Sequence, residues 1–342
     1  MKDFINQLER EQRKVDFDSF DISVKELVSM SEEEIIDIAP EYQRQFRWPV
    51  ENQSKLIESV LLGIPIPSLF MAANKDGSWE LIDGVQRLNS LIHFVGTAEQ
   101  LRKFNFDSSL TLKELTVLTE FNGCQFKDLP TSLRLKFSLR PLKVTTLSDK
   151  SDMKVRFDLF ERLNTGGIKL TDQEIRACVF RGPFNDLLAD LAKNEDFNAV
   201  VNLPVSKMND GTREELILKF FAYRENRHLF EHSVIDFLND YMSESSKKFN
   251  FKKNRVLFEK TFAELRLVLP NGIKRGSRST TPYNLFEAIS IGASDVIEEI
   301  LTLSSNVEEW INDAELTKLT SGATNSRPRL LARIQYCAER FK

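Results

Sequence analysis

The spacing of hydrophobic and polar positions changes along the chain and divides it into two parts. Before about residue 150, short apolar runs bounded by Pro, Gly and Asn predict strands among helices; the candidate strands are 22–24, 68–72, 79–82 and 142–147. After about residue 180, apolar residues recur at helical spacing. We therefore predict an α+β fold, with a mixed α/β N-terminal domain over residues 1–180 and an α-helical C-terminal domain over residues 181–342.

Capping and turn residues give approximate helix boundaries. Ser31 followed by Glu34 is a capping-box pattern and predicts the start of a short helix. Asn52–Leu62 is predicted to be helical and to stop at Gly63, and residues 74–78 have the composition of a hairpin turn. In the second part we expect helices at about 216–223, 234–242, 256–267, 285–303 and 330–341.

Composition favours a globular protein with a core rich in phenylalanine. The chain has 26 Phe against three Trp and five Tyr, and its net charge is −4. Nucleic-acid binding would therefore depend on local patches and not on the whole-molecule charge. No apolar run approaches the length of a membrane span or a signal peptide, and the three cysteines (Cys124, Cys178 and Cys337) lie far apart. We expect a cytoplasmic protein with no membrane partner and no disulfide framework.

The first candidate site is the sequence from Asp83 to Arg87. A strand that ends at Gly84 and opens a helix offers backbone N–H groups and the positive end of a helix dipole to a phosphate. Arg87 would add a donor fork, and Asp83 could hold a magnesium ion or position an attacking water. Gln86 could orient that water or bond a base. The alternative is an ordinary strand–turn–helix with a surface arginine.

Two other segments could also bind a nucleotide. Gln43 and Arg44 lie between aromatic residues in an extended stretch, which suits base stacking and phosphate binding. The alternative is an edge segment with solvated arginines. Asn164, Thr165, Gly166 and Gly167 could form an anion-binding backbone nest, or a plain helix end. The capping box that follows, Thr171–Glu174, opens a helix carrying Arg176, which is either a ligand or a surface charge.

Two further patterns occur in the second part of the chain. Lys274, Arg275 and Arg278 lie in one loop that could contact a nucleic-acid backbone, although a solvated surface is the alternative. His228, Glu231 and His232 match the His-x-x-Glu-His pattern of some zinc enzymes. The residues around them indicate a connection between two helices, so we do not expect zinc there.

The order and spacing of these segments resemble a known family. Tyr-Gln-Arg-x-x-x-Trp, Gly-Ile-Pro-Ile-Pro, Asp-Gly-x-Gln-Arg-Leu and Arg-Leu-Asn-Thr-Gly-Gly-x-x-Leu-x-x-x-Glu-x-Arg follow one another along the chain. Together they resemble the N-terminal domain of GmrSD-type (type IV) restriction enzymes over about residues 20–240. Related domains occur in the phosphorothioate-sensing SspE proteins of phage defence, and the core is similar to the ParB/sulfiredoxin-type nucleotide-binding fold.

The resemblance implies binding and hydrolysis of a nucleoside triphosphate with magnesium. It assigns this chemistry to Asp83, Gly84, Gln86 and Arg87, and nucleotide contacts to Gln43, Arg44 and residues 164–167. The family carries a glutamine where this chain has Val85. If that glutamine positions the attacking water, hydrolysis here is slow or absent while binding survives.

The leading interpretation is a nucleotide-binding, NTP-hydrolysing regulatory module that senses DNA within a restriction-like phage-defence system. Its expected partners are DNA and a nuclease or other defence subunit. The alternatives are a non-catalytic DNA-binding adaptor and a ParB-like metal-dependent nuclease. Many relatives carry a His-Asn-His nuclease segment after this domain and this sequence has none, so we expect no DNA cleavage by this chain alone. The identity of the nucleotide, any DNA modification and the oligomeric state stay open.

Overall fold

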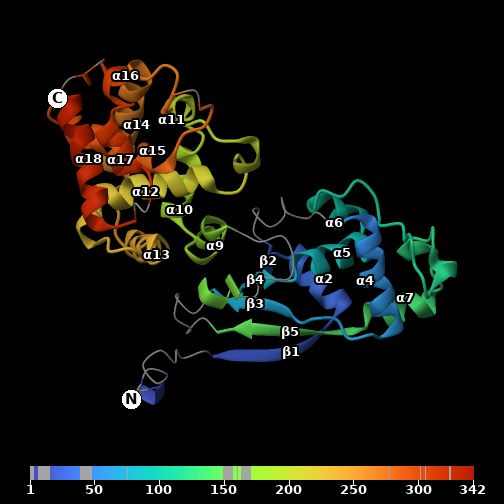
Figure 1. The fold of residues 1–342 in the computed structure, drawn as a ribbon. Coiled ribbons are helices and arrows are strands. Elements are labelled where there is room, and N and C mark those ends of the chain that lie inside the picture. The colour runs from blue at the N-terminus through green and yellow to red at the C-terminus, as the bar shows by residue number, and fades with distance from the viewer. Residues whose placement is uncertain are drawn as a thin grey trace. The chain divides into compact units, whose positions relative to one another are not determined.

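The computed structural model of the protein divides into two compact units, residues 1–169 and 170–342 (Figure 1). It describes residues 4–6, 16–38, 48–74, 76–148, 157–159, 161–162, 171–276, 278–300, 302–304, 306–322 and 325–342. The division falls before helix α9 (Asp172–Val179), whereas the boundary drawn from the sequence falls behind it, after residue 180. The two units are described separately.

A five-stranded mixed sheet forms the centre of the first unit, in the order β1-β5-β3-β4-β2. Its strands are β1 (Phe17–Ser23), β2 (Ile36–Asp37), β3 (Leu69–Ala73), β4 (Trp79–Asp83) and β5 (Pro141–Leu147). The predicted hairpin is confirmed, because β3 and β4 pair antiparallel, while β3 pairs parallel with β5. The register of β3 against β4 shifts between Phe70 and Met71, opposite the end of β4. This irregularity lies beside the turn from Asp83 into the next helix.

The helices of the first unit are α2 (Val24–Glu32), α4 (Val50–Leu62), α5 (Val85–Val95), α6 (Ala98–Lys103) and α7 (Thr131–Ser138), with short 3₁₀ turns η1 (Thr119–Phe121) and η2 (Phe126–Asp128). Helix α5 packs against α2 and α4. It buries Leu88, Leu91 and Ile92 completely. Phe94, near its end, makes edge-to-face contacts with Phe126 and Phe137. These contacts fix α5, and with it the turn that precedes it.

The helix start predicted at Ser31 is wrong. Helix α2 begins at Val24, where the Ser23 side chain accepts a hydrogen bond from the N–H of Glu26, and it ends at Glu32. Ser31 lies in its last turn, and its hydroxyl donates to the carbonyl of Leu27 (2.8 Å). The capping-box residues therefore close this helix.

The second unit is helical in its described residues, as predicted. Its helices are α9, α10 (Pro183–Leu191), α11 (Glu195–Val200), α12 (Thr212–Asn226), α13 (Val234–Ser245), α14 (Phe251–Val268), α15 (Tyr283–Val296), α16 (Val307–Trp310), α17 (Ala314–Thr320) and α18 (Arg327–Phe341), with 3₁₀ turns η3 (Val205–Lys207) and η4 (Arg227–Leu229). Together with the mixed sheet of the first unit, this confirms the predicted fold class.

Helix α15 is the central element of the second unit and packs against α12, α14 and α18. A Cβ placed at Gly292 would lie 2.8 Å from Cys337 Cβ, so the approach of α15 to α18 requires glycine. The helix predicted to reach residue 303 ends at Val296, where Lys260 donates to the carbonyl of Ile297 (2.7 Å). Phenylalanine rings from α11, α12, α14 and α15 form one cluster, as the composition predicted; they include Phe197, Phe220, Phe258, Phe262 and Phe286.

Candidate functional site

The turn from β4 into α5 is built around Gly84. This residue has φ +107° and ψ 13°, a left-handed conformation that favours glycine. A Cβ built at Gly84 would also overlap Leu69 Cδ2. The glycine is therefore required by the packing of the turn against β3, in addition to the phosphate approach expected from the sequence. No side chain caps α5 and its first turn holds no acidic residue. The positive end of its dipole is thus not neutralised by a cap.

Arg87 links this turn to the segment that precedes β3. Its Nη2 lies 2.6 Å from Asp83 Oδ2, and its Nη1 donates to the carbonyls of Pro67 (2.5 Å) and Ser68 (2.8 Å). The side chain is only 11% exposed. Arg87 is therefore not the solvated surface arginine of the alternative interpretation. Its contacts hold the Asp83 carboxylate and the guanidinium together at the start of α5.

Gln86 forms a hydrogen bond with the backbone of Trp48, the last residue of the Tyr-Gln-Arg-x-x-x-Trp segment. Its Oε1 accepts a hydrogen bond from the N–H of Trp48 (3.1 Å), and Gln53 of α4 donates to the carbonyl of the same Trp48 (2.9 Å). Sequence analysis missed Gln53, which no motif marks. Gln43 and Arg44 lie outside the described residues, as do residues 164–167. The structure thus joins Trp48 to the motif on α5 and leaves these other candidates unplaced.

Val85, which departs from the family pattern, is the first residue of α5 and is buried. Its side chain contributes to the core of the first unit and has no polar group. A hydroxyl or amide that could orient a water is therefore missing at this position.

A magnesium ion at Asp83 would need further oxygen ligands. Among the described residues, no group of three or more His, Cys, Asp or Glu side chains is arranged to hold a metal ion. Asp83 alone would leave most ligand positions of magnesium to be filled. The residues fit a magnesium ion only if phosphate oxygens and water supply the other ligands, which is how magnesium is commonly bound with nucleotides.

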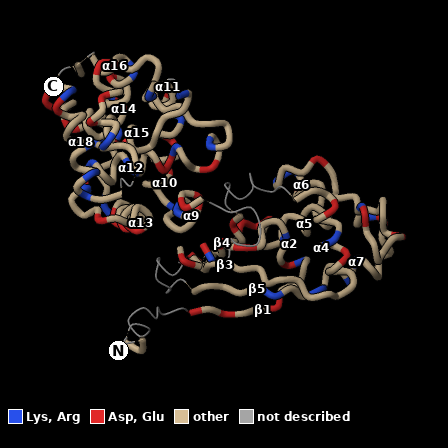
Figure 2. Tube along the Cα trace, in the orientation of Figure 1, with Lys and Arg blue, Asp and Glu red and all other residues tan. Residues whose placement is uncertain are grey.

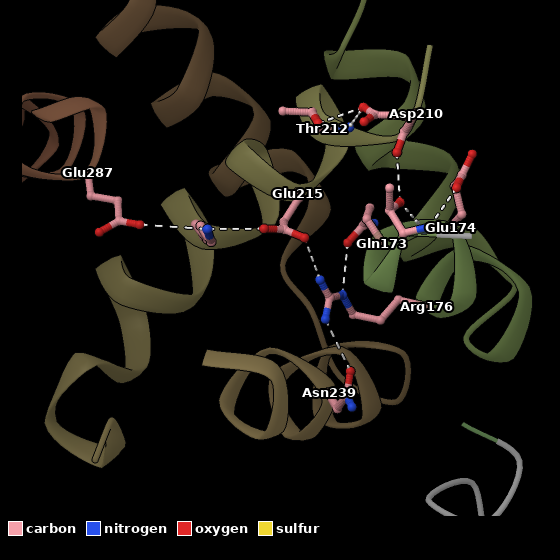
Figure 3. Close-up of polar contacts among 10 residues, drawn as sticks. Gln173, Glu174, Arg176, Asp210, Thr212, Glu215, Asn239 and Glu287 are labelled. Atoms are coloured by element: carbon pink, nitrogen blue, oxygen red, sulfur yellow. Dashed lines mark hydrogen bonds and ion pairs between the residues drawn. The ribbon is translucent and has the colours of Figure 1, made fainter. Parts of the chain in front are cut away.

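Glu174 and Arg176, the last residues of the family-like pattern, belong to the second unit (Figure 3). The capping box is formed: Thr171 Oγ1 accepts from the N–H of Glu174 (3.2 Å), and Glu174 Oε2 accepts from the N–H of Thr171 (2.7 Å). Arg176 is 1% exposed and pairs with Glu215 of α12 (2.7 Å). It also donates to Gln173 (2.9 Å). Arg176 is therefore not a surface charge but a buried ion-pair partner within the second unit.

The ion pair of Arg176 continues into a buried network (Figure 3). Lys219 Nζ lies 3.0 Å from Glu215 Oε1 and 3.8 Å from Glu287 Oε1, and Arg333 pairs with Glu287. Burial by itself raises the pKa of Glu215, but Lys219 and Arg176 outweigh it and hold that pKa below its usual value. The carboxylate is therefore charged at neutral pH, and the network ties α9 to α12, α15 and α18.

The zinc-like pattern lies across the 3₁₀ turn η4 and the loop that precedes α13. His228 lies in η4, and α13 begins after Ser233, whose side chain accepts from the N–H of Asp236 (3.3 Å). The two histidines therefore do not lie one turn apart on a single helix. In the basic loop, Lys274 and Arg278 line a surface pocket, while Arg275 donates to Thr320 (2.9 Å).

No helix in the described part of the chain is long and apolar enough to cross a membrane. Lysine and arginine positions alternate with aspartate and glutamate positions along both units (Figure 2). This distribution agrees with the small net charge and leaves any attraction for phosphate to local groups.

The β4–α5 turn lies within a segment of the chain that matches a family model. Residues 24–181 match the family described as GmrSD restriction endonuclease, N-terminal domain. No curated protein matches the chain. A solved structure, titled "Structure of the C2221 form of Pnob8-like ParB-N domain", aligns with 96% of this chain and 97% of its own at 11% identity. Its TM-score is 0.24, which is too low to establish a shared fold.

Proposed function

Because residues 24–181 match the model of the GmrSD restriction endonuclease N-terminal domain family, we propose that the chain is a nucleotide-binding regulatory module of a restriction-like phage-defence system. It binds a nucleoside triphosphate in the first unit, hydrolyses it slowly, and couples binding to the recognition of DNA or of a nuclease partner.

The observation that supports this proposal best is the β4–α5 turn. It combines an uncapped helix N-terminus, a left-handed glycine, and a facing carboxylate and guanidinium. N–H groups at such a helix start bind phosphate oxygens. In the described part of the chain, Arg87 makes three hydrogen bonds, which use three of the five donors of a guanidinium. The other two are available for a phosphate oxygen while the carbonyls of Pro67 and Ser68 stay bonded.

Each residue of the turn has a role in this proposal. Arg87 and the first N–H groups of α5 bind the phosphates, and Asp83 contacts a magnesium ion that the nucleotide brings with it. The ion would neutralise phosphate charge. Gln86 keeps the Trp48 backbone against α5 (3.1 Å).

The buried Val85 accounts for slow turnover, and this can be tested by restoring the family residue. We expect weak magnesium-dependent phosphate release from one of ATP, GTP, CTP or UTP by the wild type. Val85→Gln should raise the rate by about 10-fold or more, in the range by which one positioned group accelerates a proton transfer or attack. Asp83→Ala should abolish release from both proteins.

Arg102→Ala serves as the control, because Arg102 lies on α6 and bonds only the carbonyl of Ala98 among the contacts described (3.1 Å). Equal background rates in the wild type, Val85→Gln and Asp83→Ala would show that the chain is not a hydrolase.

A non-catalytic adaptor is the second candidate, and the buried, apolar Val85 favours it. In that case the protein binds nucleotide or DNA, Val85→Gln gains no turnover, and DNA binding survives Asp83→Ala. Magnesium-dependent nicking of plasmid DNA that Asp83→Ala abolishes would support the nuclease alternative instead.

A further inference from the structure

The loop between α14 and α15, residues 269–282, is named the basic loop because it carries Lys274, Arg275 and Arg278. It is fixed at both ends: the N–H of Ile273 donates to a carbonyl at the end of α11 (2.7 Å), and that of Thr281 donates to the carbonyl of Asn202 (2.8 Å). Gly272 has φ +81°, and a Cβ there would overlap Asn202 Nδ2. These contacts hold the described backbone of the basic loop in one conformation.

The basic loop borders an open pocket of about 570 Å³, which lies within the range of ligand sites. Lys274 and Arg278 line it, together with the polar side chains of Ser279 and Asn312. Glu308 is the one acidic residue in its described lining. The N–H of Gly276 donates to Asn312 Oδ1 (3.1 Å), which attaches the middle of the loop to the opposite wall.

The cations of the basic loop differ from other arginines of the second unit. In the part of the chain that the structure describes, no carboxylate pairs with Lys274, Arg275 or Arg278. By contrast, Arg255 pairs with Asp190 (2.7 Å) and Arg266 with Asp196 (2.8 Å). Cations that are held close together without a counter-charge repel one another, and a bound anion would relieve this repulsion.

Arg275 has a supporting role and does not line the pocket. It is half-buried and donates to Thr320 of α17 (2.9 Å), while its Nε is buried without a hydrogen-bond partner. Burial lowers the pKa of Arg275, and the nearby charge of Arg278 lowers it further. The guanidinium therefore positions the loop backbone and adds positive potential behind Lys274 and Arg278.

We propose that the pocket between Lys274 and Arg278 binds a backbone phosphate of DNA. The described lining has no aromatic side chain on which a base could stack, so the contact positions DNA without reading its sequence. The inference rests on the proposed function in naming DNA as the source of the phosphate; the anion site itself follows from the geometry.

The test is the affinity of a fluorescent DNA duplex for the full chain, measured by anisotropy over a range of salt concentrations. The double variant Lys274→Ala/Arg278→Ala should bind at least about 10-fold more weakly, and the slope of log affinity against log salt should fall by about one, for the one phosphate contact that is lost. Glu308→Gln should tighten binding, because it removes the negative charge from the pocket.

The matched control is Arg255→Ala/Arg266→Ala, which removes the same charge from the same unit but from cations that already have carboxylate partners. Equal weakening by both double variants would overturn the proposal, because only the net charge would then matter. Binding of inorganic phosphate or free nucleotide at the loop, with no binding of DNA, would also overturn it.

Titrating nucleoside triphosphates into the same proteins distinguishes a failure of the DNA site from a failure of the proposed nucleotide-binding function. If the basic-loop double variant weakens DNA binding but no protein binds a nucleotide, the DNA site is supported and the proposed function is contradicted. Nucleotide binding that the loop double variant retains, together with no DNA binding by the wild type, contradicts only the DNA site. Thermal unfolding of each variant establishes that it is folded.

Discussion

At the scale of single residues, Gly84 has two structural constraints. Its backbone is left-handed, and the space that a Cβ would need is taken by Leu69. Gly77 provides a comparison, because it has a similar φ of +88° with no heavy atom within 4 Å of a built Cβ. Comparing the two glycines therefore separates the free-energy cost of a left-handed backbone from the cost of overlap with Leu69.

Gly84→Ala should therefore destabilise the first unit more than Gly77→Ala does. We expect about 1 kcal/mol for Gly77→Ala, the usual cost of left-handed backbone in a residue with a Cβ. For Gly84→Ala we expect about 2–4 kcal/mol, since overpacking adds about 1–3 kcal/mol. Urea unfolding followed by tryptophan fluorescence measures both values. Equal values would mean that the Leu69 contact imposes no constraint.

The sequence predicted the turn at Asp83–Gly84 but not what its side chains contact. The carbonyls of Pro67 and Ser68 that Arg87 binds lie 20 and 19 residues away along the chain, so no local pattern indicates them. The pairing of Trp48 with Gln86 and Gln53 is equally non-local. Propensity and periodicity describe neighbours along the chain, whereas these contacts depend on how β3, α4 and α5 pack.

At the scale of elements, the two capping-box patterns had opposite outcomes. Thr171–Glu174 starts α9, as predicted, whereas Ser31–Glu34 does not start a helix. The difference lies in the preceding residues, because Val24, Leu27, Val28 and Ser31 are buried at helical spacing and define a helix that is already under way. A buried apolar face therefore outweighed the local cap.

Helix α9 is attached to the second unit by the buried charge of Arg176, and its removal should be costly. Arg176→Ala leaves the half-buried Glu215 with Lys219 as its remaining partner, and we expect about 3 kcal/mol of destabilisation, the lower end of the cost of breaking a buried ion pair. Arg255→Ala breaks an exposed pair and should cost no more than about 1 kcal/mol. The measurement is chemical denaturation followed by far-ultraviolet circular dichroism.

The double variant Arg176→Met/Glu215→Gln sharpens this experiment. It should be more stable than Arg176→Ala, because it removes both charges of the pair, while Lys219 keeps Glu287 as a partner (3.8 Å). If Arg176→Ala and Arg255→Ala lower the free energy of unfolding equally, the network contributes no more to stability than a surface ion pair does.

At the scale of the whole molecule, the family match and the compact units have different boundaries. Residues 24–181 match the family, but α9 lies in the second unit with residues 170–342. The composition change between residues 150 and 180 predicted two parts. The unit to which α9 belongs could not be predicted from the sequence, because it depends on the Arg176–Glu215 pair, whose residues are 39 positions apart. Residues 164–167 thus precede, in the sequence, a helix that belongs to the second unit.

The central claim is that the first unit binds a nucleoside triphosphate at the β4–α5 turn. Calorimetric titration of ATP, GTP, CTP and UTP with magnesium into the wild type, Arg87→Ala and Arg102→Ala tests it most directly. We expect one triphosphate to bind the wild type and Arg102→Ala alike, and to bind Arg87→Ala about 10–100-fold more weakly, as for the loss of a charged hydrogen bond. Absence of binding to the wild type, or equal affinity for all three proteins, would contradict the claim.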